Sequence, residues 1–192
     1  MATTQAPQSK KYRHIVETAE ELFFKHSVKR VSVEEICAKA NVSKMTFYRY
    51  FSNKQELAEH IIHLMFEQGY AKLDEVEALE IPFTEKIQMI LDFKLEFVEK
   101  MSSEYIREYM HLIQGTLMQQ WMERVMRFMR HAQERGDIRA DVRPELIMLT
   151  LDKYSELVDD QRIAQIYPDY AELTRDIWRL FYYGVLPRKD EA

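Results

Sequence analysis

Apolar residues recur every three or four positions along most of this chain, the spacing that places them on one side of an α-helix. In residues 11–26 the apolar positions are Tyr12, Ile15, Val16, Ala19, Leu22 and Phe23. The first nine residues are polar and lack this period, so we expect an unstructured tail there. The pattern predicts a first amphipathic helix at residues 11–26, with its apolar stripe facing a core.

The second predicted helix is short and begins at a capping residue. Ser32 is followed three residues later by Glu35, a pair in which each side chain can satisfy a backbone N–H group near the other. This predicts a helix at residues 33–40. Asn41 follows it, and asparagine tolerates the left-handed backbone conformation that closes many helices.

A third and a fourth helix are introduced in the same way. Ser43 is the expected N-cap of a helix at residues 44–51. A second cap, at Ser52 or Asn53, precedes a long apolar-periodic stretch, which predicts a helix at residues 54–79.

The remainder of the chain also has helical periodicity, interrupted where proline and glycine occur. The helices expected there span about residues 84–101, 104–113, 116–135, 144–160 and 168–183. Glycine (4) and proline (5) are scarce, which disfavours a sheet with many turns. We therefore expect an all-α protein of about nine helices.

Charge divides the chain into two unequal parts. Residues 1–54 carry ten Lys and Arg against five Glu, a balance of +5, whereas the whole chain has a formal net charge of −5, so residues 55–192 carry −10. A basic N-terminal part is the expected footprint of a nucleic-acid-binding module. We place a DNA-binding domain at residues 1–54 and a larger helical domain at residues 55–192.

Cysteine usage and hydropathy bear on the compartment. The one cysteine, Cys37, excludes an internal disulfide, and its place beside Ile36 in the second predicted helix favours a packed thiol. No apolar run approaches the ~20 residues that cross a bilayer, and the N-terminus lacks the apolar stretch of a signal peptide. We expect a soluble cytoplasmic protein without a membrane partner.

Two short helices joined by a tight turn form a helix-turn-helix, whose second helix places its N-terminus in the major groove of double-stranded DNA. The Ser43 hydroxyl and the free N–H groups beside it can bind a phosphate, because the helix dipole is positive there. Lys44 and Thr46 can reach base edges, and Arg49 a guanine or a phosphate. Further donors to the DNA backbone are Tyr48, Tyr50 and Lys54.

The segment AKANVSKMTFYRYFSNKQEL, residues 38–57, closely resembles the DNA-binding signature of the TetR family of bacterial regulators. The resemblance extends back through Ile15, Ala19, Leu22, Phe23, Ser32, Ile36 and Ala40. It implies a three-helix DNA-binding head followed by a larger domain for ligand binding and dimerisation. It also implies DNA contacts for the residues that match the family's contact positions, namely Ser32, Ser43, Lys44, Thr46, Tyr48, Tyr50 and Lys54.

Three positions depart from the family pattern. Ser27 and Asn41 stand where glycine is common, and Met45 stands where a small residue or proline is common. Asn41 can hold the backbone shape of the glycine. Met45 projects an apolar side chain toward the groove, where it can contact a thymine methyl group, so we add it to the candidate DNA contacts and leave the base preference open.

The larger domain is rich in methionine and aromatic residues, which have two interpretations. They can form an ordinary helical-bundle core, or they can line an apolar cavity for a small molecule. The family resemblance implies an inducer pocket among the fourth to seventh helices, and hence a largely apolar or aromatic ligand. The candidate pocket residues are Phe66, Tyr70, Phe93, Phe97, Met101, Tyr105, Tyr109, Met118, Trp121 and Met122.

The last two predicted helices are apolar over more of their circumference than surface helices are. In regulators of this family, such a pair joins its symmetry mate in a four-helix dimer interface, which also suits a palindromic operator. We expect a homodimer on this ground. The candidate interface residues are Leu146, Leu149, Tyr154, Leu157, Leu173, Ile177, Trp178 and Phe181.

The sequence offers no support for catalysis or for a cofactor. His60 and His63 lie one helical turn apart, a spacing that is compatible with a metal but common on exposed helix faces, so we predict no metal site. The expected function is a DNA-binding transcriptional regulator, a repressor that a small molecule releases from a pseudo-palindromic operator. Two alternatives stay open: a ligand-insensitive architectural DNA-binding protein, and a ligand-carrying bundle with a vestigial head.

Overall fold

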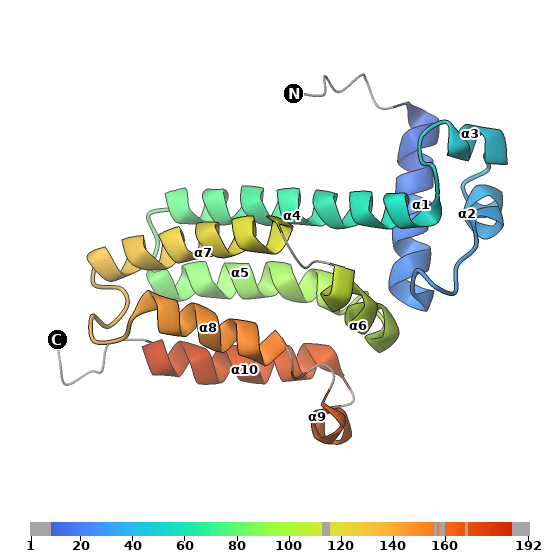
Figure 1. The fold of residues 1–192 in the computed structure, drawn as a ribbon. Coiled ribbons are helices and arrows are strands. Elements are labelled where there is room, and N and C mark those ends of the chain that lie inside the picture. The colour runs from blue at the N-terminus through green and yellow to red at the C-terminus, as the bar shows by residue number, and fades with distance from the viewer. Residues whose placement is uncertain (1–8, 113–115, 156, 158–159, 168, 186–192) are drawn as a thin grey trace.

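The computed structural model describes residues 9–112, 116–155, 157, 160–167 and 169–185, and every regular element in these residues is a helix. A small head contains α1 (Lys10–His26), α2 (Val33–Lys39) and α3 (Lys44–Tyr48), as Figure 1 shows. The long helix α4 (Lys54–Ala78) leads from the head into the larger domain. The expected all-α fold with an N-terminal head and a larger helical domain is confirmed.

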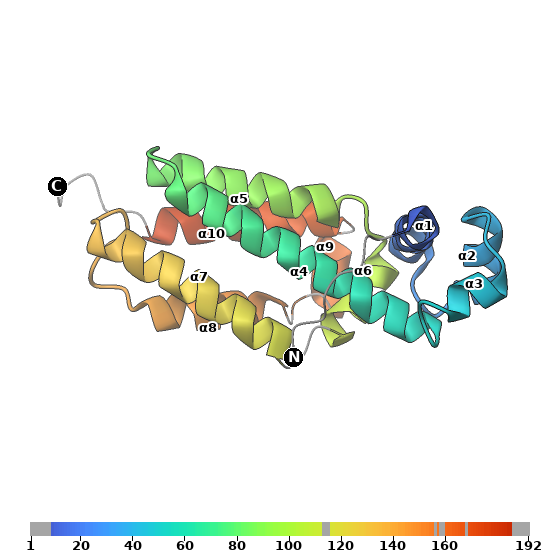
Figure 2. The same ribbon diagram turned by 90° about the horizontal axis from the view of Figure 1, so that it is seen from above.

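The larger domain is a layered bundle built around α4. Its other helices are α5 (Phe83–Val98), α6 (Ser103–Leu112), α7 (Thr116–Glu134), α8 (Pro144–Ser155), α9 (Gln161–Ile166) and α10 (Tyr170–Val185). Helix α4 packs on both α5 and α7, while α10 packs on α5 and α8 packs on α7. Viewed from above in Figure 2, α5 lies over α10 on one side of α4, and α7 lies over α8 on the other.

Each of the first four helices begins at a side chain that accepts a hydrogen bond from the backbone N–H three residues later; the caps are Ser9, Ser32, Ser43 and Asn53. These bonds satisfy N–H groups that the helices leave without partners. Between Ser52 and Asn53, the structure makes Asn53 the cap of α4, at 2.8 Å from the Glu56 N–H group. The Glu56 carboxylate accepts from the Ser52 N–H group at 2.6 Å, which completes the box.

Two turns in the head use backbone conformations that favour glycine. Asn41 has a φ of 53°, so it adopts the left-handed conformation that its residue type predicts. Ser27 has a φ of 71° and a ψ of 157°, a region occupied almost only by glycine. Its hydroxyl is also buried without a hydrogen-bond partner among the described residues. Ser27 therefore destabilises the folded chain locally, at the end of α1.

The head core is filled by side chains from all of its helices and from α6. Phe23, Ile36, Phe47 and Leu57 are fully buried in one cluster, and Tyr105 of α6 joins them. Tight apolar packing of this kind fixes the relative positions of the three head helices. The orientation of α3 is therefore set by the core beneath it.

One helix differs from the sequence-based expectation. Helix α8 ends at Ser155, and a separate short helix, α9, precedes α10, so the described chain has ten helices where we expected about nine. Asp160 begins the separate helix, because its carboxylate accepts from the Arg162 N–H group at 2.8 Å and caps α9. None of the helices in the described part of the chain is long and apolar enough to span a membrane.

Candidate nucleic-acid interface and ligand cavity

One face of helix α3 packs in the head core, and the opposite face is exposed to solvent. Phe47 points inward and is fully buried, whereas Met45 is 84% exposed and Tyr48 is 54% exposed. Ser43, Lys44 and Arg49 are also exposed on this short element. Large side chains that are held this rigidly yet remain uncovered are typical of a surface that binds a partner.

Two basic side chains on this face have only weak partners within the chain. Lys44 forms an ion pair with Glu34 of α2, and both side chains are more than half exposed. The Arg49 guanidinium lies 5.1 Å from the centre of the Tyr50 ring. Exposed ion pairs contribute little free energy, so phosphate groups can replace these partners at small cost.

The remaining predicted DNA contacts also have structural roles. Ser32 caps α2, and Thr46 lies half-buried beside the Ser43 hydroxyl at 3.0 Å. The Tyr50 hydroxyl lies 2.5 Å from the Ser9 hydroxyl. The Lys54 ammonium group donates to the carbonyls of the loop before α2, at 3.0 Å to Lys29 and 2.7 Å to Val31. Lys54 thus ties α4 to that loop and keeps one donor for another acceptor.

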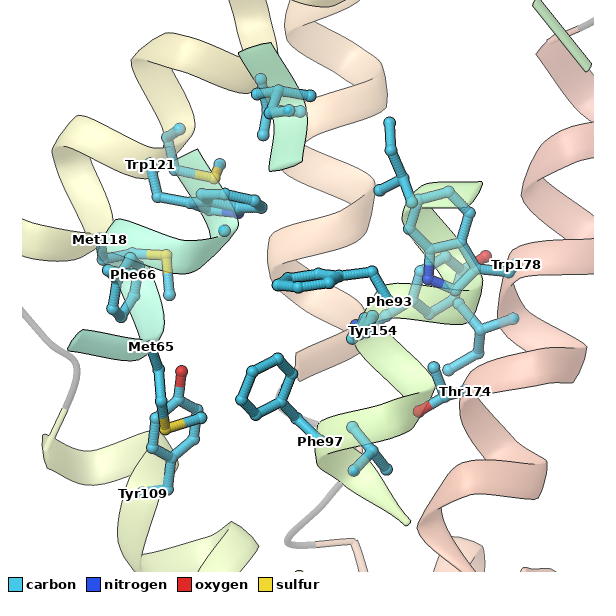
Figure 3. A pocket seen from close by; sticks show the side chains of 18 of the residues that line it. Met65, Phe66, Phe93, Phe97, Tyr109, Met118, Trp121, Tyr154, Thr174 and Trp178 are labelled. Atoms are coloured by element: carbon cyan, nitrogen blue, oxygen red, sulfur yellow. The ribbon is translucent and has the colours of Figure 1, made fainter. Parts of the chain in front are cut away.

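The larger domain contains an apolar cavity of about 320 Å³, bordered by side chains from α4, α5, α6, α7, α8 and α10 (Figure 3). Pockets for small organic ligands typically measure about 300–1,000 Å³. Eight of the ten expected pocket residues line it: Phe66, Phe93, Phe97, Met101, Tyr109, Met118, Trp121 and Met122.

The other two expected pocket residues lie elsewhere. Tyr70 packs beneath Arg124, whose guanidinium lies 4.5 Å from the ring centre, and its hydroxyl donates to the Leu117 carbonyl at 3.4 Å. Tyr105 is fully buried in the head core, where its ring centre lies 5.0 Å from that of Phe24. Both belong to apolar stripes, but the stripe alone does not say which neighbour it faces.

Several cavity residues were not among those we expected from the sequence. Met65, Met129, Met148, Tyr170 and Thr174 line the cavity, and so does one charged residue, Lys94. Lys94 has a sequence signal, because it lies four residues after Ile90 and three before Phe97 on the cavity-facing side of α5. A lysine in the middle of an apolar helical stripe marks an unusual environment.

The residues expected at a dimer interface lie in different surroundings. Tyr154, Ile177 and Trp178 line the cavity, and Leu173 is buried. Leu157 is half-buried, and the side chain of Phe181 lies outside the described residues. The outward-facing leucines of α8 and α10 are highly exposed, at 59% for Leu146, 60% for Leu149 and 70% for Leu180.

Helix α6 contacts the head on one side and the cavity on the other. Its Glu108 carboxylate accepts from the Val28 N–H group at 2.7 Å, and its Glu104 pairs with Arg30 at 3.0 Å. On its other side, Ile106 and Tyr109 line the cavity. The same short helix therefore joins the turn after α1 to the cavity wall.

The two neighbouring histidines lie in ordinary surroundings. His60 is hydrogen-bonded to the Tyr12 hydroxyl and its ring lies 5.5 Å from that of Phe51, while His63 is exposed beside Glu67. Among the described residues, no group of three or more His, Cys, Asp or Glu is placed to hold a metal ion.

The N-terminal part of the chain is similar to known regulatory proteins. Residues 15–61 match the family described as bacterial regulatory proteins, tetR family. An uncharacterised HTH-type transcriptional regulator of Bacillus subtilis (strain 168), YhgD, is 32% identical over 83 residues, which are 43% of this chain and 44% of that protein. The aligned segment thus spans less than half of the curated relative.

Solved structures share the fold over nearly the whole chain. The regulatory protein TetR from Rhodobacter sphaeroides has a TM-score of 0.72 at 17% identity, covering 93% of this chain and all of that one. SmeT, the repressor of the Stenotrophomonas maltophilia multidrug efflux pump SmeDEF, has a TM-score of 0.63 at 20% identity, covering 96% and 93%. The N-terminal segment thus matches the tetR family of bacterial regulatory proteins over residues 15–61, and the fold of the whole chain is shared with these solved structures.

Proposed function

We propose that this protein is a dimeric transcriptional regulator that binds an operator through α3 and responds to a small molecule in the cavity of its larger domain. The observation that carries this proposal is the solvent-exposed face of α3. Met45 and Tyr48 are exposed on this face, whereas the opposite face of the helix is fully packed. Rigid presentation of a helix N-terminus suits major-groove binding.

The charge distribution supports DNA as the partner of this face. The head carries a balance of +5 in a chain of net charge −5. Lys44 and Arg49 flank the exposed side chains, and Ser43 places its hydroxyl at the start of α3. Such a surface combines phosphate contacts, which set the position, with side chains that can reach base edges.

Dimerisation is supported by the outer face of α8 and α10. Leu146 and Leu149 of α8 and Leu180 of α10 are exposed apolar side chains that a second copy of the chain can cover. Two heads related by a twofold axis would then meet two half-sites of a pseudo-palindromic operator.

Ligand response requires a path from the cavity to the head, and α4 and α6 provide one. Both helices line the cavity, and both pack on α1. A ligand that fits one arrangement of these helices better than another shifts the balance between the two arrangements. We assign repression as the outcome, since SmeT, which shares the fold, is a repressor. The cavity favours this function over a ligand-insensitive architectural role.

DNA binding is tested by electrophoretic mobility shift with the segment upstream of the protein's own gene, and by selection from a random double-stranded library. We expect a salt-sensitive complex with a pseudo-palindromic sequence. Lys44→Ala and Tyr48→Ala should each weaken it roughly tenfold or more. The control is Lys72→Ala, which removes a half-buried lysine of α4 that pairs with Glu75 in the larger domain.

Lys54 is less suitable for this test, because its replacement also removes two hydrogen bonds to the loop before α2. Unchanged affinity of a Lys44→Ala, Tyr48→Ala double variant would contradict the assigned interface. Sedimentation tests the dimer, and Leu149→Glu should produce monomers because it places a charge in the apolar surface.

A further inference from the structure

Lys94 gives the cavity a chemical character that its other residues lack. Around this cavity the described side chains are aliphatic, aromatic or methionine, with the hydroxyls of Tyr109, Tyr154, Tyr170 and Thr174 as the main polar groups. Among these residues, Lys94 is the one with an ionisable amine. No described acidic residue borders the cavity.

The Lys94 ammonium group has no hydrogen bond or ion pair with any residue that the structure describes. Its side chain is accessible to solvent and borders the cavity. Burial lowers the pKa of Lys94 below its usual value. A charge in such surroundings is costly unless an opposite charge joins it.

Lys94 lies on the cavity-lining side of α5. Ile87, Ile90, Phe97 and Val98 line the cavity on the same helix, at spacings that place Lys94 near the middle of their stripe. The outward face of α5 carries other polar residues, including Gln88, which donates to Asp92 at 2.7 Å.

Resting on the ligand response proposed above, we propose that the cavity binds an organic anion with one carboxylate and an apolar body, and that Lys94 pairs with that carboxylate. The apolar body would lie against the aromatic and methionine side chains seen in Figure 3. Unbranched methionine side chains adapt to different shapes, so aliphatic and aromatic bodies both suit the cavity.

Tyr109 is a second polar group for the same ligand. Its hydroxyl has no hydrogen-bond partner among the described residues, and its side chain lines the cavity. Burial raises the pKa of Tyr109 well above its usual value, so the phenol stays protonated and can donate a hydrogen bond. A neutral donor together with one ammonium group suits a single negative charge better than a doubly charged phosphate ester.

The structure also supplies the reporter for a binding measurement. Both tryptophans of the chain, Trp121 and Trp178, line the cavity. Their fluorescence can therefore follow occupancy without DNA. The full chain is titrated with dodecanoate, 1-dodecanol and dodecylammonium below their micellar concentrations, and with the aromatic pair 2-naphthoate and 2-naphthol.

We expect at least one carboxylate to bind about ten- to a hundredfold more tightly than its matched alcohol, the range of a charge-assisted hydrogen bond. The ammonium compound should bind weakest. Preference for dodecanoate would identify an aliphatic body, and preference for 2-naphthoate an aromatic one. Lys94→Met, which keeps the length and removes the charge, should abolish the preference for carboxylate over alcohol, while Lys94→Arg should keep it.

The role of Lys94 would be overturned if Lys94→Met left the ratio of the affinities for carboxylate and alcohol unchanged. Tighter binding of the alcohol than of the carboxylate by the unaltered protein would also overturn it. Absence of binding by every compound would overturn it as well. A melting curve checks that Lys94→Met is folded, and Lys94→Gln provides a second uncharged variant. The mobility shift is measured separately: a carboxylate that binds through Lys94 without releasing DNA would contradict the proposed response and leave the anion site intact.

Discussion

The head and the larger domain are built from the same kinds of residue and use them differently. In the head, Phe23 and Phe47 are fully buried against other side chains. In the larger domain, Phe93 and Phe97 are half-buried and border a cavity of about 320 Å³. Apolar helices therefore fill space completely in one part of the molecule and leave it open in the other.

This difference matches what each part is proposed to do. The head must hold α3 in one orientation, which a close-packed core achieves. The larger domain is proposed to exchange a ligand, which requires a cavity, although filling that cavity would increase stability. Substitutions in the two parts can test this contrast between a filled core and an open cavity.

Removing a ring should cost more in the head than at the cavity. We expect Phe47→Ala to lower the free energy of unfolding by about 3–5 kcal/mol, because it opens a hole in a filled core. Phe93→Ala should cost about 1–2 kcal/mol, since part of that ring faces space already. Urea unfolding followed by circular dichroism measures both.

The fluorescence of the two tryptophans reports on unfolding of the larger domain, because both residues lie there. In Phe47→Ala, the head should unfold at lower urea concentration than the tryptophan fluorescence transition. Equal losses of stability in the two variants would show that the head core and the cavity wall are packed alike.

Ser27→Gly should stabilise the head by about 1–3 kcal/mol, the range of relieving one strained backbone conformation. The change also removes a buried hydroxyl that lacks a partner among the described residues. Thermal melting measures it, with Ser27→Ala as control, because alanine removes the hydroxyl but keeps the strain. A similar gain in both variants would assign the cost to the hydroxyl.

Gly69→Ala tests whether a side chain in the cavity wall can move to make room for an added methyl group. An added methyl carbon at Gly69 would lie 3.1 Å from the Trp121 ring, and the ring borders open space into which it can shift. We expect the gain in helix propensity and the crowding to leave stability within about 1 kcal/mol, while the cavity narrows. Weaker binding of large ligands would follow in the fluorescence titration, and an unchanged titration would show that the ring does not move inward.

The smallest expected effect is a pH dependence of the head. Burial lowers the pKa of His60 below its usual value of 6.5, so the unfolded chain takes up a proton more readily than the folded one. Stability should therefore fall as the pH drops below about 6.5. His60→Gln should reduce the fall in melting temperature between about pH 7.5 and about pH 5.5. An equal fall in both proteins would assign it to other groups.

Local signals made much of the head predictable. The caps Ser32 and Ser43 and the left-handed Asn41 act over three or four residues, and the structure has them as the sequence indicates. The short helix α9 was missed because its signal, Asp160, lies within a stretch that also has helical periodicity. Local capping and periodicity competed there, and capping prevailed.

Assignments that depend on distant neighbours were harder. The apolar periodicity of α6 is visible in the sequence, yet Tyr105 is buried in the head core, whereas Tyr109 packs against that core and also lines the cavity. The apolar surfaces of α8 and α10 were equally visible, but Trp178 lines the cavity while Leu180 is exposed. Periodicity gives the direction of a side chain about its own helix, not what lies in that direction.

The helical fold, the helix-turn-helix with its caps, and the basic head beside an acidic domain follow from the sequence, because these depend on residue spacing and on summed charge. Only the tertiary structure decided that an apolar stripe borders empty space in one domain and a packed core in the other. It also decided that Lys94 faces that space without a described partner. Burial and pairing arise from helices far apart in the chain, and no local pattern records how those helices meet.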